Sequence, residues 1–239
     1  MRLALPFVGR KREAGELRLL HAQRKHALIL SPAGMGKTAL LSSLSDDLNL
    51  LVCPHSERLG AICESLEAEF RLIAGDLKLL QRKQRLLRAL AQAQRTVVFD
   101  GTGWTTPRLS SFLEGAMERV PVWICARSEH PWDIGHVWPL LWNFVRVELK
   151  PFVLADTRSL IETCVEEQLV PADVLSTVEW LQHRSKGNPF VLRELLGELS
   201  SHSYDLGNPH ALELLDIDRR IHELFPVGSD AEKPKSPRQ

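Results

Sequence analysis

The sequence has few cysteines, no excess of charge of either sign and no long apolar run. Its four cysteines, Cys53, Cys63, Cys125 and Cys164, form no C-x-x-C pair, which argues against a zinc site or a disulfide framework. The formal net charge is +0, so no global field draws the chain to nucleic acid or membrane. No window approaches the ~18–20 apolar residues of a transmembrane helix, and the N-terminal apolar stretch is too short for a signal peptide. We therefore expect a protein of the reducing cytoplasm, with no membrane partner.

What the chain does contain is an alternation of short apolar runs with helical patterns. The runs predicted as buried strands cover residues 26–32, 49–54, 96–100, 120–128 and 144–152. Helical spacing fills the intervals, including a long stretch at 56–94 that is interrupted near 74–76. Strands that alternate with helices are typical of a parallel sheet covered on both faces. The expected fold class is α/β, with a five-stranded, mainly parallel sheet between helices.

The strand pattern disappears after Asp156. Three helical patterns follow, at 155–168, 172–184 and 189–202. The last residues, 226–239, are polar and punctuated by proline, a composition typical of disorder. We expect an α/β core at 1–152, a small all-helical lid at 153–225 and a disordered tail at 226–239.

The stretch "SPAGMGKT", residues 31–38, joins a predicted strand to a predicted helix. This context indicates a P-loop, in which glycines aim backbone N–H groups at phosphate oxygens. Lys37 would reach the β- and γ-phosphates, and the Thr38 hydroxyl would ligate Mg²⁺. The first position of the motif is Ser31 instead of glycine, a mild change at a turn. The predicted nucleotide contacts are Pro32, Ala33, Gly34, Met35, Gly36, Lys37, Thr38 and Ala39.

A P-loop also needs an acid on a second strand to hold the Mg²⁺ shell. "VVFD" supplies one, because Asp100 closes an apolar run. We interpret the pair Thr38 and Asp100 as the Mg²⁺ site of a bound nucleotide. The alternative interpretation is an aspartate that caps the loop after the strand.

Taken in order, these motifs resemble the AAA+/STAND branch of P-loop ATPases, and the small archaeal-type and transposition-accessory members in particular. "PFVGRKREAGELRLL" is similar to the N-terminal box of that branch, which implies that Val8, Gly9 and Arg10 lie against the adenine. "VPVWICARS" resembles the first sensor strand, so Arg127 or Ser128 is expected near the γ-phosphate. The resemblance makes Lys37, Asp100 and Arg127 the candidate catalytic residues.

The helical part carries its own share of this resemblance. "RSKGNPFVLRELL" resembles the Gly-x-Pro turn of STAND proteins, which implies that Gly187, Asn188 and Pro189 close over the nucleotide. Arg193 is a candidate second sensor, or a surface arginine paired with Glu194 or Glu198.

One position departs from the family pattern. The residue after the Mg²⁺ aspartate is commonly a second acid that polarises the attacking water, and here it is Gly101. Losing a positioned base typically costs ~10²–10⁴-fold in rate. Whether Thr102 or a more distant acid substitutes is left open by the sequence. We expect an ATP binder whose hydrolysis is slow or depends on a partner.

Three functions remain open. The first is an ATP-driven conformational or assembly switch that acts through a second copy or a protein partner. The second is a DNA-associated accessory ATPase, of the kind that acts in transposition or replication loading. The third is a scaffold that holds nucleotide without hydrolysing it. DNA would be held by a basic strip, which otherwise is an ordinary solvated helix face: Lys78, Arg82, Lys83, Arg85 and Arg88.

A tryptophan-rich segment, residues 130–144, has two interpretations as well. It contains three of the six tryptophans of the chain and is either an exposed docking surface or a connection that packs on the core.

Overall fold

The computed structural model describes residues 5–54, 56, 58–73, 77–201, 206 and 208–224. The tail predicted at 226–239 and the helix interruption predicted at 74–76 lie outside the described residues. The chain divides into two units, Phe7–Pro151 and Phe152–Gln239, the latter together with Met1–Pro6. The two units are described separately below.

A sheet of five strands forms the centre of the first unit. Its strands are β1 (Ala27–Leu30), β2 (Leu51–Cys53), β3 (Val97–Thr102), β4 (Val122–Ala126) and β5 (Val145–Glu148). They lie in the order β2-β3-β4-β1-β5, and all the pairings in this sheet are parallel. The predicted α/β fold is thus confirmed, and the sheet is parallel throughout its described strands.

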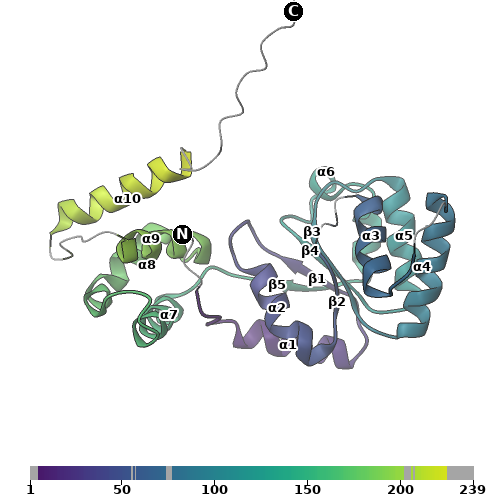
Figure 1. Ribbon diagram of the computed structural model, residues 1–239, viewed down its shortest axis with the longest axis horizontal. Helices are drawn as coiled ribbons and strands as arrows, with labels where there is room; N and C mark the ends of the chain where they lie inside the picture. Colours follow the sequence, from purple (N-terminus) through teal and green to yellow (C-terminus); the bar gives the residue numbers. More distant parts are fainter. Residues whose placement is uncertain are drawn as a thin grey trace, which may run out of the picture. The chain divides into compact units, whose positions relative to one another are not determined.

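Helices cover both faces of this sheet (Figure 1). One face carries α1 (Lys11–Ala22) and α2 (Lys37–Leu48), and the other carries α3 (Leu59–Glu69), α4 (Leu79–Ala93) and α5 (Pro107–Met117). Successive side chains of β3 point to opposite faces, as strand geometry requires.

The two hydrophobic cores show this alternation directly. Val97 and Phe99 belong to the core under α3, α4 and α5, whereas Val98 between them packs with α1 and α2. Burial on both sides explains why the strands read as continuous apolar runs instead of alternating ones.

The connection from β4 to β5 contains two short helical elements, α6 (Pro131–Ile134) and the 3₁₀ helix η1 (Trp138–Asn143). It is anchored to the loop after β3 through Thr105, which is fully buried and pairs with Gly135 in an isolated bridge. Ile134, Val137 and Leu141 from this connection enter the core.

The second unit is helical in its described part. It contains α7 (Leu154–Glu166), η2 (Ala172–Thr177), α8 (Val178–Ser185), α9 (Pro189–Ser201) and α10 (Pro209–Leu224). The first four occupy the three predicted helical segments, and α10 is an additional helix that the sequence patterns did not single out. Asp216 of α10 is buried and forms an ion pair with Arg184 of α8, with 3.8 Å between Nη1 and Oδ2, so α10 is tied to the preceding helices. Among the described residues, no helix is both long and apolar enough to cross a membrane.

Candidate functional site

The predicted P-loop connects β1 to α2. Gly34 and Gly36 have φ values of 81° and 87°, in the left-handed region that glycine adopts without strain. Gly36 is the residue that caps the N-terminus of α2, where the first backbone N–H groups have no partner inside the helix. This loop and helix terminus form the kind of backbone site that binds phosphate.

Lys37 is held inside the loop by three acceptors. Its Nζ donates to the Ser31 carbonyl oxygen at 2.6 Å, to Ser31 Oγ at 2.9 Å and to the Pro32 carbonyl oxygen at 3.1 Å. A glycine at position 31, as the motif prescribes, would offer only its carbonyl. Ser31 therefore does more than shape the turn, because its hydroxyl contacts the lysine that would bind phosphate.

The two predicted Mg²⁺ ligands are in contact. Thr38 Oγ1 donates to Asp100 Oδ2 at 2.6 Å, which joins the start of α2 to the end of β3. The Cys125 thiol of β4 lies within electrostatic reach of the Asp100 carboxylate. Burial raises the pKa of Cys125 well above its ordinary value, and the Asp100 charge adds to the effect, so this thiol stays neutral.

Arg127, the predicted first sensor, follows β4 and is exposed. It acts electrostatically on the P-loop: burial lowers the pKa of Lys37, Arg127 lowers it further, and Asp100 opposes the shift. Asp100 and Arg127 thus both act electrostatically on Lys37 at one end of the sheet, because parallel strands place their carboxyl ends at the same edge. Sequence reasoning treated Cys125 only as a small core hydrophobe, since its position beside Asp100 depends on the strand order.

Gly101, which stands where a second acid is common, lies in a bulge. Phe99 pairs with Ile124 and Thr102 with Ala126, so β3 has one extra residue against β4 in this interval. Gly101 occupies it with φ at 72°, a left-handed conformation that costs other residues about 1–2 kcal/mol. The neighbouring Thr102 is buried and its hydroxyl donates to the Phe99 carbonyl oxygen at 3.2 Å. Its hydroxyl is therefore committed to the backbone and does not replace the missing base.

Arg10, predicted to lie against the adenine, is 4% exposed. Its guanidinium donates to the Met35 carbonyl oxygen at 2.9 Å and to the Lys150 carbonyl oxygen at 2.7 Å. Glu13 lies 3.4 Å away as its ion-pair partner. Arg10 thus ties the P-loop to the residues after β5. The adjacent Val8 and Gly9 are partly exposed, and Gly9 turns the chain with φ at 83°.

The predicted Gly187–Asn188–Pro189 turn lies in the second unit, between α8 and α9. Gly187 has φ at 69°, and a Cβ added there would lie 2.2 Å from the Phe152 carbonyl oxygen. Asn188 Oδ1 accepts from the Phe190 N–H at 2.9 Å, and Pro189 begins α9. Helix capping and a close backbone approach account for these three residue types. The guanidinium of Arg193 in the same helix lies over the Phe190 ring, 4.8 Å from its centroid.

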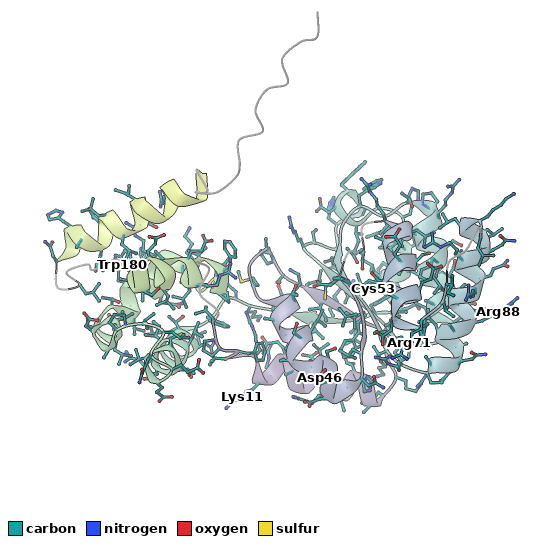
Figure 2. All side chains as sticks on the ribbon, viewed as in Figure 1. Lys11, Asp46, Cys53, Arg71, Arg88 and Trp180 are labelled. Carbon is teal, nitrogen blue, oxygen red and sulfur yellow. The ribbon has the colours of Figure 1, made fainter. Side chains whose placement is uncertain are left out.

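The basic strip on α4 is largely engaged within the domain. Arg82 makes two hydrogen bonds to Glu67, at 2.8 and 2.6 Å. Lys83 donates to Ser111 Oγ at 2.8 Å, and Arg85 to the Ile73 carbonyl oxygen at 2.7 Å. Arg88, by contrast, is exposed on the outer side of α4 (Figure 2).

The residues present fit a magnesium–nucleotide complex. The glycine-rich turn and the helix terminus supply backbone donors for phosphate, and Lys37 supplies a cation. Thr38 and Asp100 supply two adjacent oxygen ligands. Among the described residues, no group of three or more His, Cys, Asp or Glu side chains could hold a metal ion. The two oxygen ligands Thr38 and Asp100 suit Mg²⁺, which usually takes one or two protein ligands and completes its shell with water and phosphate oxygens.

The fold and this site define a P-loop NTPase architecture. Neither a family model nor a curated protein matches the sequence. Solved structures do match. The Orc1 protein of Aeropyrum pernix in complex with DNA has 18% identity and a TM-score of 0.63 over 93% of this chain and 69% of its own. A Walker-type ATPase of Pyrococcus abyssi has 16% identity and a TM-score of 0.61 over 91% and 75%.

A STAND protein with a tetratricopeptide repeat sensor from Pyrococcus horikoshii is similar as well. It has 18% identity and a TM-score of 0.53 over 90% of this chain, but only 33% of its own length is covered. At these identities the comparisons establish the fold. The chain therefore has the fold of AAA+ and STAND P-loop ATPases, as its motifs predict.

Gly187 provides a test of the turn between α8 and α9. We expect Gly187→Ala to lower the free energy of unfolding by roughly 2–4 kcal/mol, because it combines a disfavoured φ with a clash against Phe152. Lys186→Ala, at the preceding position, is the matched control and should change stability little. Chemical denaturation measures both. Equal stability of Gly187→Ala and the parent would contradict the geometry.

Arg10 offers a second test. We expect Arg10→Ala to destabilise the first unit by roughly 3–5 kcal/mol, because it leaves the buried Glu13 without its partner. ATP binding should weaken in parallel, since Met35 of the P-loop loses its donor. Arg10→Lys retains the charge but lacks the forked guanidinium that donates to two acceptors. Its stability and ATP affinity should lie between those of the parent and of Arg10→Ala. Denaturation and calorimetric titration measure the two effects. Lost ATP affinity at unchanged stability would instead indicate a direct nucleotide contact.

Proposed function

We propose that this protein binds Mg·ATP and uses it as a conformational or assembly switch, with hydrolysis that is slow or stimulated by a partner. The observation that carries this proposal is the contact between Thr38 and Asp100 at 2.6 Å, beneath a loop whose lysine is directed inward. A threonine hydroxyl, an aspartate of a second strand and a P-loop lysine are the three side chains that a magnesium–nucleotide site needs.

The chain's own residues have separate tasks in this proposal. The N–H groups around Gly34 and Gly36 bind phosphate oxygens, and Lys37 exchanges its contacts with Ser31 and Pro32 for contacts with the β- and γ-phosphates. Thr38 and Asp100 hold Mg²⁺, which neutralises charge on the phosphate oxygens when bound. Arg127 supplies a further cation near the γ-phosphate.

We expect slow hydrolysis because a glycine, Gly101, follows Asp100 at the end of β3. A water molecule attacking the γ-phosphate is normally oriented by a base after the Mg²⁺ aspartate, and Gly101 has no side chain for this task. Binding and positioning remain in place without it. The switch would therefore dwell in its ATP state until a partner, or a second copy, contributes the missing group.

The helical unit is the proposed moving part. The resemblance to STAND proteins implies that Gly187, Asn188 and Pro189 close over bound nucleotide. The same resemblance makes Arg193 in α9 a candidate second sensor of the γ-phosphate.

A DNA-associated accessory ATPase is the second candidate. It is favoured by the structural similarity to an Orc1 protein that was solved in complex with DNA. The basic strip of α4 supports it less, because Arg82, Lys83 and Arg85 are engaged with groups of their own domain. A polyanion would have to compete with these contacts.

Calorimetric titration of ATP, with and without Mg²⁺, and steady-state hydrolysis test the proposal. We expect Mg²⁺-dependent binding that is abolished in Lys37→Ala and retained in Lys11→Ala, which removes an exposed lysine of α1. Turnover should be slow for the protein alone. Turnover that appears only with duplex DNA would favour the DNA-associated alternative. Absence of binding to the parent protein would refute the proposal.

Restoring the second acid gives a more specific prediction. We expect Gly101→Glu to leave the hydrolysis rate within about tenfold of the parent, far from the 10²–10⁴-fold gain typical of a positioned base. The reason is the left-handed φ of Gly101, which directs a Cβ differently from a regular strand and costs about 1–2 kcal/mol of stability. Gly101→Ala, which carries the same backbone strain without a carboxylate, is the control. A hundredfold faster Gly101→Glu relative to Gly101→Ala would overturn this account of the bulge.

A further inference from the structure

A pocket of about 390 Å³ opens beside the end of β4, outside the P-loop. The indoles of Trp138 and Trp142 and the ring of Pro131 form part of its wall, and Glu129 and Arg146 provide charged groups. Nothing in the proposed nucleotide chemistry uses these side chains.

Its aromatic walls are unusually open to solvent. Trp142 is 78% exposed and Trp138 40%, whereas tryptophan is highly buried on average. Exposed indoles are typical of surfaces that bind another molecule, because they offer a large, rigid contact area. The tryptophan-rich segment thus packs on the core through Ile134, Val137 and Leu141, while the indoles of Trp138 and Trp142 are exposed to solvent.

The segment is held rigidly in this shape. The fully buried Thr105 donates its hydroxyl to the Ile134 carbonyl and accepts from the Val137 N–H at 2.9 Å. Gly135 has φ at 68°, and an added Cβ would lie 2.7 Å from the Thr105 carbonyl oxygen. A surface fixed in this way loses little conformational entropy when a ligand binds.

The charges of the pocket indicate the class of ligand. Glu129 and Arg146 pair at 2.6 Å and remain 43% and 48% exposed, so together they give the pocket no net positive charge. Nucleic-acid affinity depends on cations that neutralise phosphates, and the lining offers no excess of them. The partly exposed Glu129 carboxylate can instead accept from a basic side chain. Indole walls beside a carboxylate suit an extended peptide with prolines and a basic residue, since proline-rich segments dock in aromatic-lined grooves.

Such a segment occurs in this chain. Residues 232–239 read "EKPKSPRQ", in which Pro234 and Pro237 have P-x-x-P spacing and Arg238 follows. Residues 233–239 contain three basic side chains and no acidic one, which complements Glu129. These residues lie outside those that the structure describes.

We propose that residues 232–239 of a second copy of this chain bind in this pocket, with the prolines against Trp138 and Trp142 and a basic side chain at Glu129. The contact joins the tail of one copy to the pocket of another, and two copies can exchange their tails reciprocally. It needs no nucleotide and stands independently of the proposed ATP chemistry. Ser128, which also lines the pocket, directly follows Arg127, so the same loop links this surface to the Lys37 environment.

The test begins with a fluorescently labelled peptide of residues 230–239, titrated with the full-length protein in the absence of nucleotide. Anisotropy should show saturable binding. We expect Trp142→Ala to weaken it at least tenfold, as for an interface hot spot, and Glu129→Gln to weaken it severalfold. Trp132→Ala is the matched control, because Trp132 is 80% exposed in the same segment but does not line the pocket. A peptide with both prolines replaced by alanine should not bind.

Sedimentation velocity of the full-length chain tests the second copy. Association should rise with concentration and be lost in Trp142→Ala and in the Pro234→Ala/Pro237→Ala double variant, with circular dichroism unchanged. It should persist in Trp132→Ala. The proposal fails if the peptide does not bind, if Trp142→Ala binds it normally, or if the parent stays monomeric. Trp142-dependent binding of a single-stranded oligonucleotide without peptide binding would assign the pocket to nucleic acid instead.

Discussion

The hydrogen bond from Thr38 to Asp100 joins the two chain segments on which the proposed site depends. One segment is the loop from β1 into α2, and the other is the end of β3, which is separated from β1 in the sheet by β4. Because every strand is parallel, their carboxyl ends meet at one edge, and α2 starts there with its backbone donors directed outward. This shared edge brings Asp100 close to Lys37, Cys125 and Arg127, because the segments that carry these residues begin or end there.

Arg10 also stabilises this edge of the sheet, through its contacts with the P-loop and with the residues after β5. A buried guanidinium that donates to the backbone of the P-loop and of the residues after β5 makes the conformation of one dependent on the other. Lys150 is the next-to-last residue of the first unit, so this contact lies where the chain leaves the α/β core.

The end of β3 differs from an ordinary hydrolytic site in two ways. Gly101 has no acidic side chain, and its backbone forms a bulge. An isolated replacement of an acid by glycine in a regular strand would be a change of chemistry alone. Here Gly101 fills a bulge in the left-handed region, so the backbone itself is built around glycine. A slow switch whose active state is completed by another molecule is consistent with this arrangement, and a tail-to-pocket contact between copies offers one route to such completion.

The sequence by itself determined the fold class, the five strands and the phosphate-binding loop. Apolar runs between helical patterns are a local property, and "SPAGMGKT" carries its chemistry within eight neighbouring residues. Tertiary structure decided the rest, because it depends on which strands are neighbours and where side chains end. Only the strand order places Cys125 near Asp100, only the bulge reveals why Gly101 is glycine, and only packing engages Arg82, Lys83 and Arg85 within the domain. The exposure of Trp138 and Trp142 was likewise open in the sequence, since the same indoles would have suited a buried connection.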